Sequence, residues 1–182
     1  MKKLLSGRNL VNAIGVPGWL FLIWKGDIFY AAFILIVVVL ALGEFYNLSI
    51  KKGAKPLRWI GMVCSVFIVD YFYVQPSISS HQIIGCIIFT IIMTLIWELF
   101  SKKEEPILNI ISTLSGIMIV PLLLGTSVDI RQFDTLMNTN LTFTLVISIW
   151  SCDSAAFIFG SFFGSKKILP RVSPNKSWIG SI

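Results

Sequence analysis

The chain has 182 residues, of which 55% are hydrophobic and 13% charged, and its mean hydropathy is +0.83. A soluble domain of this size could not bury so much apolar surface, so the composition excludes a water-soluble globular protein and predicts one surrounded by lipid. The net charge of +6 would suggest a nucleic-acid partner in a soluble protein. Here the basic residues lie between apolar runs, where they indicate membrane topology, and we expect no nucleic acid as a partner.

Six apolar runs are long enough, or nearly so, to cross a bilayer, which takes roughly 20 residues. They cover about residues 9–24, 28–46, 57–74, 83–100, 107–124 and 141–163. The connections between them are short, and the longest is expected at about 125–140. The pattern therefore predicts an all-α, polytopic membrane protein, with one transmembrane domain over residues 1–182 and a polar segment over 165–182.

The basic residues are distributed unevenly among these connections. All but two of the fifteen Lys and Arg fall in the two terminal tails and in the second and fourth connections, and the exceptions are Lys25 and Arg131. The positive-inside rule then predicts that both termini are cytoplasmic and that the protein is a multi-pass protein of the cytoplasmic membrane. Cys64, Cys86 and Cys152 lie in apolar runs without a CxxC pair, so neither a disulfide framework nor a zinc site is expected.

Asp153 is an acidic residue inside the sixth apolar run. Ionisable groups within the membrane are costly and by default mark a functional site. Asp153, Ala156, Gly160 and Gly164 are spaced 3, 4 and 4 residues apart, which is one stripe of a helix whose small residues allow a second helix to approach. The carboxylate is therefore expected to point into protein and to hold Mg²⁺, which commonly bridges protein oxygens and phosphate. The alternative is a structural hydrogen bond to a neighbouring helix.

Other acidic residues in the apolar runs have simpler interpretations. Glu44 and Glu98 end the second and fourth runs and are expected to be interface residues near Lys51 or Lys102. Asp70 lies near the outer end of the third run and is expected to be a residue that faces water.

The segment after the sixth run is basic and polar. Ser173 followed by Pro174 is typical of a helix start, with Ser as the N-cap. Free backbone N–H groups at such a start attract an anion such as phosphate, and Lys176 and Ser177 add a charge and a hydroxyl. A plain helix cap and an ordinary basic tail are the alternatives.

The order of these motifs resembles the phosphatidate cytidylyltransferase family, also called CDP-diacylglycerol synthases. The resemblance is densest over about 153–180. It rests on Asp153-Ser154-Ala155-Ala156-Phe157, Phe159-Gly160-Ser161-Phe162-Phe163-Gly164, Lys166-Lys167-Ile168-Leu169-Pro170 and Ser173-Pro174-Asn175-Lys176-Ser177-Trp178-Ile179-Gly180. Glu44-Phe45-Tyr46 and the opening Arg8 with Pro17 also resemble the family. Ile179 stands where the family usually has Glu.

The resemblance implies a reaction that joins CTP and phosphatidate to give CDP-diacylglycerol and pyrophosphate, in phospholipid biosynthesis. It implies Asp153 and Lys176 as catalytic residues, with Asp153 either as the ligand of a Mg²⁺ cofactor or as the residue that orients a phosphate-binding lysine. It implies that Arg171, Ser173, Asn175 and Ser177 bind the substrate phosphates, so that residues 165–182 form a cytoplasmic phosphate-binding segment. The bilayer is the third partner, and a homodimer is left open.

The family pattern continues past this chain, with Lys-Asp, His-Gly-Gly and Asp-Arg-x-Asp elements. We therefore expect the chain to be a fragment or a truncated gene product, the N-terminal two-thirds of a cytidylyltransferase, with little activity alone. Two other classes stay open: a CTP-dependent polyprenol or phytol kinase, and a non-enzymatic small membrane transporter that uses Asp70 and Asp153.

Overall fold

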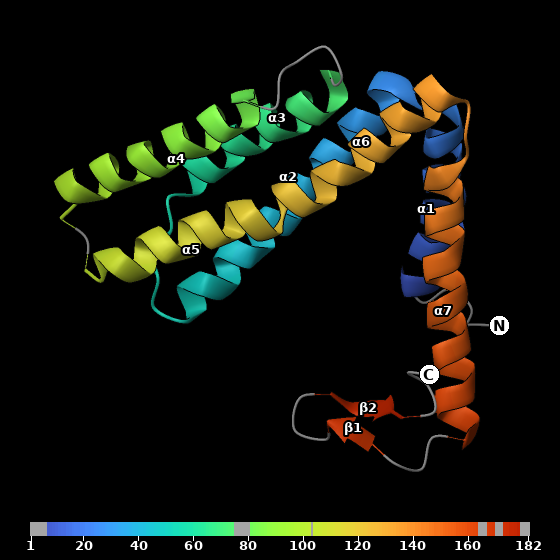
Figure 1. The fold of residues 1–182 in the computed structure, drawn as a ribbon. Coiled ribbons are helices and arrows are strands. Elements are labelled where there is room, and N and C mark those ends of the chain that lie inside the picture. The colour runs from blue at the N-terminus through green and yellow to red at the C-terminus, as the bar shows by residue number, and fades with distance from the viewer. Residues whose placement is uncertain (1–6, 75–80, 103, 164–166, 170–172, 179–182) are drawn as a thin grey trace. The chain divides into compact units, whose positions relative to one another are not determined.

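The fold is described from a computed structural model, which places residues 7–74, 81–102, 104–163, 167–169 and 173–178. The chain divides into two compact units, residues up to Thr139 and residues from Asn140 onward. Among the residues that the structure places, the first unit contains six helices (Figure 1): α1 (Gly7–Lys25), α2 (Asp27–Lys51), α3 (Arg58–Val74), α4 (His81–Phe100), α5 (Pro106–Ile119) and α6 (Pro121–Met137). The second contains α7 (Leu141–Phe163) and the strands β1 (Lys167–Leu169) and β2 (Ser173–Ser177).

Helix α2 is the centre of the first unit, since it contacts α1, α3, α5 and α6. Its buried side chains recur every four residues, which places them on one face of the helix. These side chains are Tyr30, Ile34, Val38, Leu42 and Tyr46, each at most 5% exposed, and Ala31 next to Tyr30 is also buried, at 7%. Among the described elements, helix α4 packs mainly against α3 and α5. It therefore lies at the edge of the unit, as Figure 1 shows.

Tyr46 lies in a slot between two glycines at one end of α2. A Cβ atom added at Gly61 on α3, or at Gly116 on α5, would overlap the Tyr46 ring or its hydroxyl. The Tyr46 hydroxyl donates to the carbonyl oxygen of Thr113 at 3.0 Å, in a buried setting. Small residues allow close approach of helices in lipid, and here they admit one large side chain that joins three helices.

Four stretches are long and apolar enough to cross a membrane, within the residues that the structure describes. They are Asp27–Lys51, Ile83–Phe100, Pro106–Met137 and Leu141–Phe163. The multi-pass membrane character is thus confirmed. The number six stays a prediction, as does the orientation of the termini. The predicted all-α class is confirmed for the helical body, but it missed the two short strands.

One expected connection is a helix instead. The residues predicted as the longest loop, about 125–140, largely belong to α6, which ends at Met137. Pro121 lacks an N–H and breaks the helical ladder between α5 and α6, while Val128 packs in the core at 1% exposure. The charges at Asp129, Arg131 and Asp134 lowered the hydropathy of this segment, but they did not remove its helical pattern of apolar residues.

Candidate functional site

The segment that carries the predicted phosphate-binding residues forms a hairpin. Strands β1 and β2 pair in antiparallel fashion, with Lys167 opposite Ser177 and Leu169 opposite Ser173. Between these two pairs β1 has one residue, Ile168, whereas β2 has three. Extra residues on one strand form a bulge, in which some backbone groups are left without ladder partners.

The three residues in this bulge are Pro174, Asn175 and Lys176. Proline has no N–H to give to a ladder and is tolerated at bulges and edge strands. The bulge therefore suits the Ser-Pro-Asn-Lys-Ser sequence, and it groups the backbone of the predicted residues Ser173, Asn175, Lys176 and Ser177 in one strand.

The predicted helix start at Ser173 and Pro174 is wrong, because both residues lie in β2. The fixed φ of proline fits the first turn of a helix and also an extended strand, and pairing with β1 selects the strand. Helix-dipole attraction for phosphate therefore does not apply at this segment. Arg171 lies outside the described residues, and Ser177 is buried at 2% exposure.

Asp153 lies in the middle of α7, and its side chain is exposed. It precedes the end of α7 at Phe163 by ten residues, which is about 15 Å along a helix axis. In the part of the chain that the structure describes, no hydrogen bond or ion pair to Asp153 is found. Ala156 and Gly160, on the same stripe, are half-buried, and Gly164 is outside the described residues.

Asp153 is the only predicted metal ligand, so its surroundings decide whether Mg²⁺ fits. No group of three His, Cys, Asp or Glu side chains lies together among the described residues. Mg²⁺ is often held by one or two carboxylates, with waters and substrate phosphates as its other ligands. One exposed carboxylate fits that kind of shared site, but it does not fit a site made of protein ligands alone.

A buried polar cluster that the sequence interpretation missed lies in the first unit. Glu98 is 3% exposed and Asn109 is fully buried, so Glu98 is not the exposed interface residue expected from its position near Lys102. The Asn109 Nδ2 donates to Glu98 Oε1 at 2.6 Å and to the Glu104 carbonyl oxygen at 2.9 Å. Glu98 Oε2 has no hydrogen-bond partner among the residues that the structure describes.

The same cluster anchors the connection between α2 and α3, residues 52–57. The Lys55 backbone N–H donates to Asn109 Oδ1 at 2.5 Å, and the Leu57 N–H donates to Thr113 Oγ1 at 2.9 Å. The signal for this cluster was present in the sequence, because polar residues recur every four positions inside two apolar runs. They are Thr90, Thr94 and Glu98 on α4, and Asn109 and Thr113 on α5.

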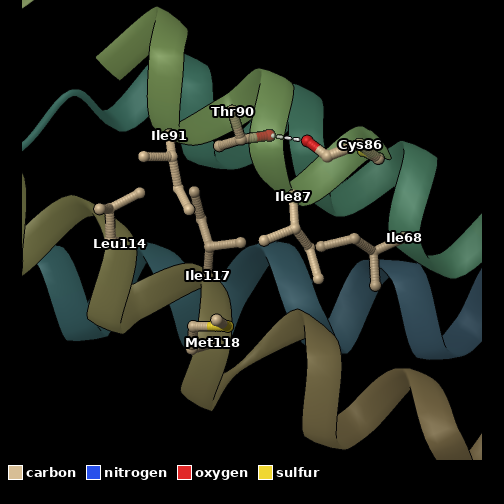
Figure 2. Close-up of a pocket in the computed structure, with 8 residues that line it drawn as sticks. All are labelled: Ile68, Cys86, Ile87, Thr90, Ile91, Leu114, Ile117 and Met118. Atoms are coloured by element: carbon tan, nitrogen blue, oxygen red, sulfur yellow. Dashed lines mark hydrogen bonds between the residues drawn. The ribbon is translucent and has the colours of Figure 1, made fainter. Parts of the chain in front are cut away.

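An apolar cavity of about 60 Å³ lies between α3, α4 and α5. Figure 2 shows isoleucines from all three helices around it, among them Ile68, Ile87 and Ile117. The one polar side chain drawn beside them, Thr90, donates to the Cys86 carbonyl oxygen at 2.8 Å. The cavity therefore offers hydrocarbon contacts and no site for a nucleotide.

The helical body and its long apolar stretches define a multi-pass membrane protein. A model of the cytidylyltransferase family matches residues 6–182, and the chain belongs to that family. No solved structure matches the chain.

Curated relatives carry a more specific name. The chain is 24% identical to phosphatidate cytidylyltransferase of Staphylococcus aureus over 177 residues, which are 96% of this chain and 65% of that protein. It is 23% identical to phosphatidate cytidylyltransferase of Bacillus subtilis over 180 residues, which cover 95% and 64% of the two chains. A stretch of 36 residues is 50% identical to the Haemophilus influenzae protein of the same name and covers 20% of this chain and 12% of that one. The chain thus spans about 65% of the length of the first relatives.

Proposed function

We propose that the protein to which these residues belong is a CTP:phosphatidate cytidylyltransferase of the cytoplasmic membrane, which makes CDP-diacylglycerol and pyrophosphate. The observation that carries this proposal is the family match over residues 6–182, together with relatives of that name that align with nearly the whole chain. In this proposal both ends of the chain face the cytoplasm, where CTP is available.

The proposed reaction needs no protein nucleophile. A phosphate oxygen of phosphatidate attacks the α-phosphorus of CTP, a new oxygen–phosphorus bond forms, and the bond to the β-phosphate breaks as pyrophosphate leaves. Two polyanions must be brought together, so the protein contributes mainly position and charge compensation. Lys176, the Ser177 hydroxyl and the backbone N–H groups in the bulge of β2 are the proposed phosphate-binding groups, with Ser173, Asn175 and Arg171 beside them in sequence.

Asp153 has a separate proposed role. Its exposed carboxylate on α7 would hold Mg²⁺ or orient a phosphate-binding lysine. When bound, Mg²⁺ supplies charge stabilisation for the departing pyrophosphate. The exposure of Asp153 and its lack of a partner in the described part of the chain support this role, since a structural carboxylate in an apolar helix would be expected to be hydrogen-bonded.

The test uses the complete open reading frame that encodes these residues, expressed in membranes and supplied with phosphatidate and CTP labelled at the α-phosphorus. Label should enter the lipid product, and Asp153→Asn and Lys176→Ala should each reduce this by about 100-fold or more. Asp129→Asn is the matched control, because Asp129 is an exposed carboxylate on α6. Near-normal turnover in both site variants would contradict the assignment of the site.

The position of the label separates this function from a CTP-dependent lipid kinase. A kinase would transfer the γ-phosphoryl group, so lipid would be labelled from γ-labelled CTP and not from α-labelled CTP. Transfer of label from γ-labelled CTP to a lipid alcohol would contradict the proposed reaction.

A further inference from the structure

Besides the apolar cavity described above, an apolar groove of about 200 Å³ lies between α3 and α4. Its walls include Trp59 and Val63 from α3, and Phe89, Met93 and Trp97 from α4. Its two polar side chains are Cys64 and Thr90, whose Sγ and Oγ1 atoms lie 3.0 Å apart in a hydrogen bond. Apart from the indole N–H groups of Trp59 and Trp97, the groove therefore presents no polar side-chain group that needs a partner from its occupant, which suits a hydrocarbon chain.

The groove has a direction. Trp59 and Trp97 meet edge to face at one end, with ring centroids 5.0 Å apart, and both are about half exposed. Tryptophan is enriched where the membrane meets water. From Trp97 the groove follows α4 through Met93 to Phe89, about 12 Å of helix, so it runs from headgroup depth into the hydrocarbon.

Positive charge gathers at the tryptophan end. Arg58 directly precedes Trp59 and is exposed, and its Nη2 donates to Asn47 Oδ1 at 2.5 Å. A guanidinium has five N–H donors, so others are available for a phosphate. The neighbouring cations are also exposed, and they are Lys51, Lys52, Lys55 and Lys102.

The connection that carries these cations is held in place. The backbone N–H groups of Lys55 and Leu57 are bound by Asn109 and Thr113, and Ala54 and Leu57 are buried. Exposed carboxylates reduce the positive charge only in part. Lys55 Nζ lies 3.5 Å from Glu104 Oε2 in an exposed pair, which is a weak interaction in water, and Glu44 and Glu105 are the other exposed carboxylates near this end.

We propose that the groove between α3 and α4 binds one acyl chain of a resident anionic phospholipid, a phosphodiester of the surrounding bilayer, whose phosphate is held by Arg58 at the tryptophan end. In a bilayer an open apolar groove is filled by lipid, and the charge beside it selects the headgroup. Arginine binds phosphate through two parallel N–H groups, which suits a single phosphodiester. This site is separate from the proposed reaction and does not depend on it.

The experiment is native mass spectrometry of the purified protein with equal amounts of phosphatidylglycerol and phosphatidylcholine that carry the same acyl chains. Phosphatidylglycerol should be retained preferentially, and Arg58→Gln should lower this preference about fivefold. Lys25→Gln, at the last residue of α1 and away from the groove, should leave this preference unchanged. An unchanged preference in Arg58→Gln would overturn the role of the cation.

The groove itself is tested by filling it. Met93→Trp should reduce retention of both lipids, whereas Leu99→Trp, the same kind of enlargement outside the groove on α4, should not. Circular dichroism and the elution volume in size-exclusion chromatography show whether each variant is folded. If Met93→Trp does not fold, Phe89→Trp is a second variant that fills the groove. Equal retention in the filled and control variants would overturn the acyl-chain site.

Phosphatidate, offered in the same experiment, distinguishes a resident lipid from a substrate. If phosphatidate is retained strongly and phosphatidylglycerol is retained no better than phosphatidylcholine, the site is a substrate site and the proposal of a resident lipid is wrong.

Discussion

Arg131 on α6 donates its Nε–H to the carbonyl oxygen of Ile23 on α1, at 2.9 Å. Ile23 is in the last turn of α1, where carbonyl groups have no partner within the helix. The guanidinium thus caps α1 and offsets the negative end of its dipole. Arg131, one of the two cations that the charge distribution places away from the others, thus has a structural partner.

Replacing Arg131 with Ala should lower the free energy of unfolding by about 1–3 kcal/mol, because a charge-assisted hydrogen bond is lost and a part-buried carbonyl is left unpaired. Thermal or denaturant unfolding in detergent measures this. Asp129→Ala, two residues away on α6 and exposed, is the control and should change the stability by less than about 0.5 kcal/mol. Equal effects of the two substitutions would mean that the cap does not stabilise α1.

The slot for Tyr46 gives a second prediction. Gly116→Ala should destabilise by about 1–3 kcal/mol, because the added methyl group overlaps the Tyr46 ring and overpacks the core. Gly85→Ala on α4 is the control, since nothing lies within 4 Å of its added Cβ, and it should be neutral or slightly stabilising.

A double-mutant cycle isolates the contact between these two residues. When Tyr46→Ala removes the ring, the further change Gly116→Ala should cost much less than it does alone, because the methyl group then has room. Strict additivity of the two changes would contradict the proposed steric fit.

Some of this fold follows directly from the sequence. The membrane character follows from composition. The core face of α2 does not, because every residue from Ile28 to Leu42 is apolar and spacing alone does not distinguish the face that is buried. Hydropathy alone ends the fifth span near residue 124 and misses α6, which continues as a helix to Met137. A helix capped by an arginine from a distant segment leaves no local pattern, so the contact between Arg131 and Ile23 could not be predicted.

The candidate site was predictable only in part. The motif around Lys176 is a local signal, but its backbone conformation depends on pairing with β1, and Pro174 is compatible with both a helix start and a bulge. Glu98 shows a similar limit. Its position at the end of an apolar run suggested an interface residue, whereas burial against Asn109 depends on how α4 and α5 pack.

Asn109→Ala should be strongly destabilising, by about 2–4 kcal/mol, because it leaves the Glu98 carboxylate and the Lys55 N–H without their partner. Asn47→Ala, which removes an exposed amide beside Arg58, is the matched control and should cost less than about 1 kcal/mol. Unfolding in detergent gives the comparison.

Limited trypsin digestion provides a local measurement of the same prediction. Loss of Asn109 should release the 52–57 connection and speed cleavage after Lys52, while Asn47→Ala should have little effect on that site. Unchanged cleavage in Asn109→Ala would show that the amide does not anchor this connection.

The two proposed roles of Asp153 are separated by the dependence of turnover on metal. Chelation should abolish CDP-diacylglycerol formation, and Mg²⁺ should restore it. If Asp153 is a ligand, Asp153→Asn should raise the Mg²⁺ concentration needed for half-maximal rate by at least about tenfold, because an amide oxygen lacks the charge that a hard cation prefers. If turnover falls while that concentration is unchanged, Asp153 does not bind the metal and instead orients a phosphate-binding lysine. In that case Lys176→Ala should add little further loss to Asp153→Asn, since the two residues would act as one unit.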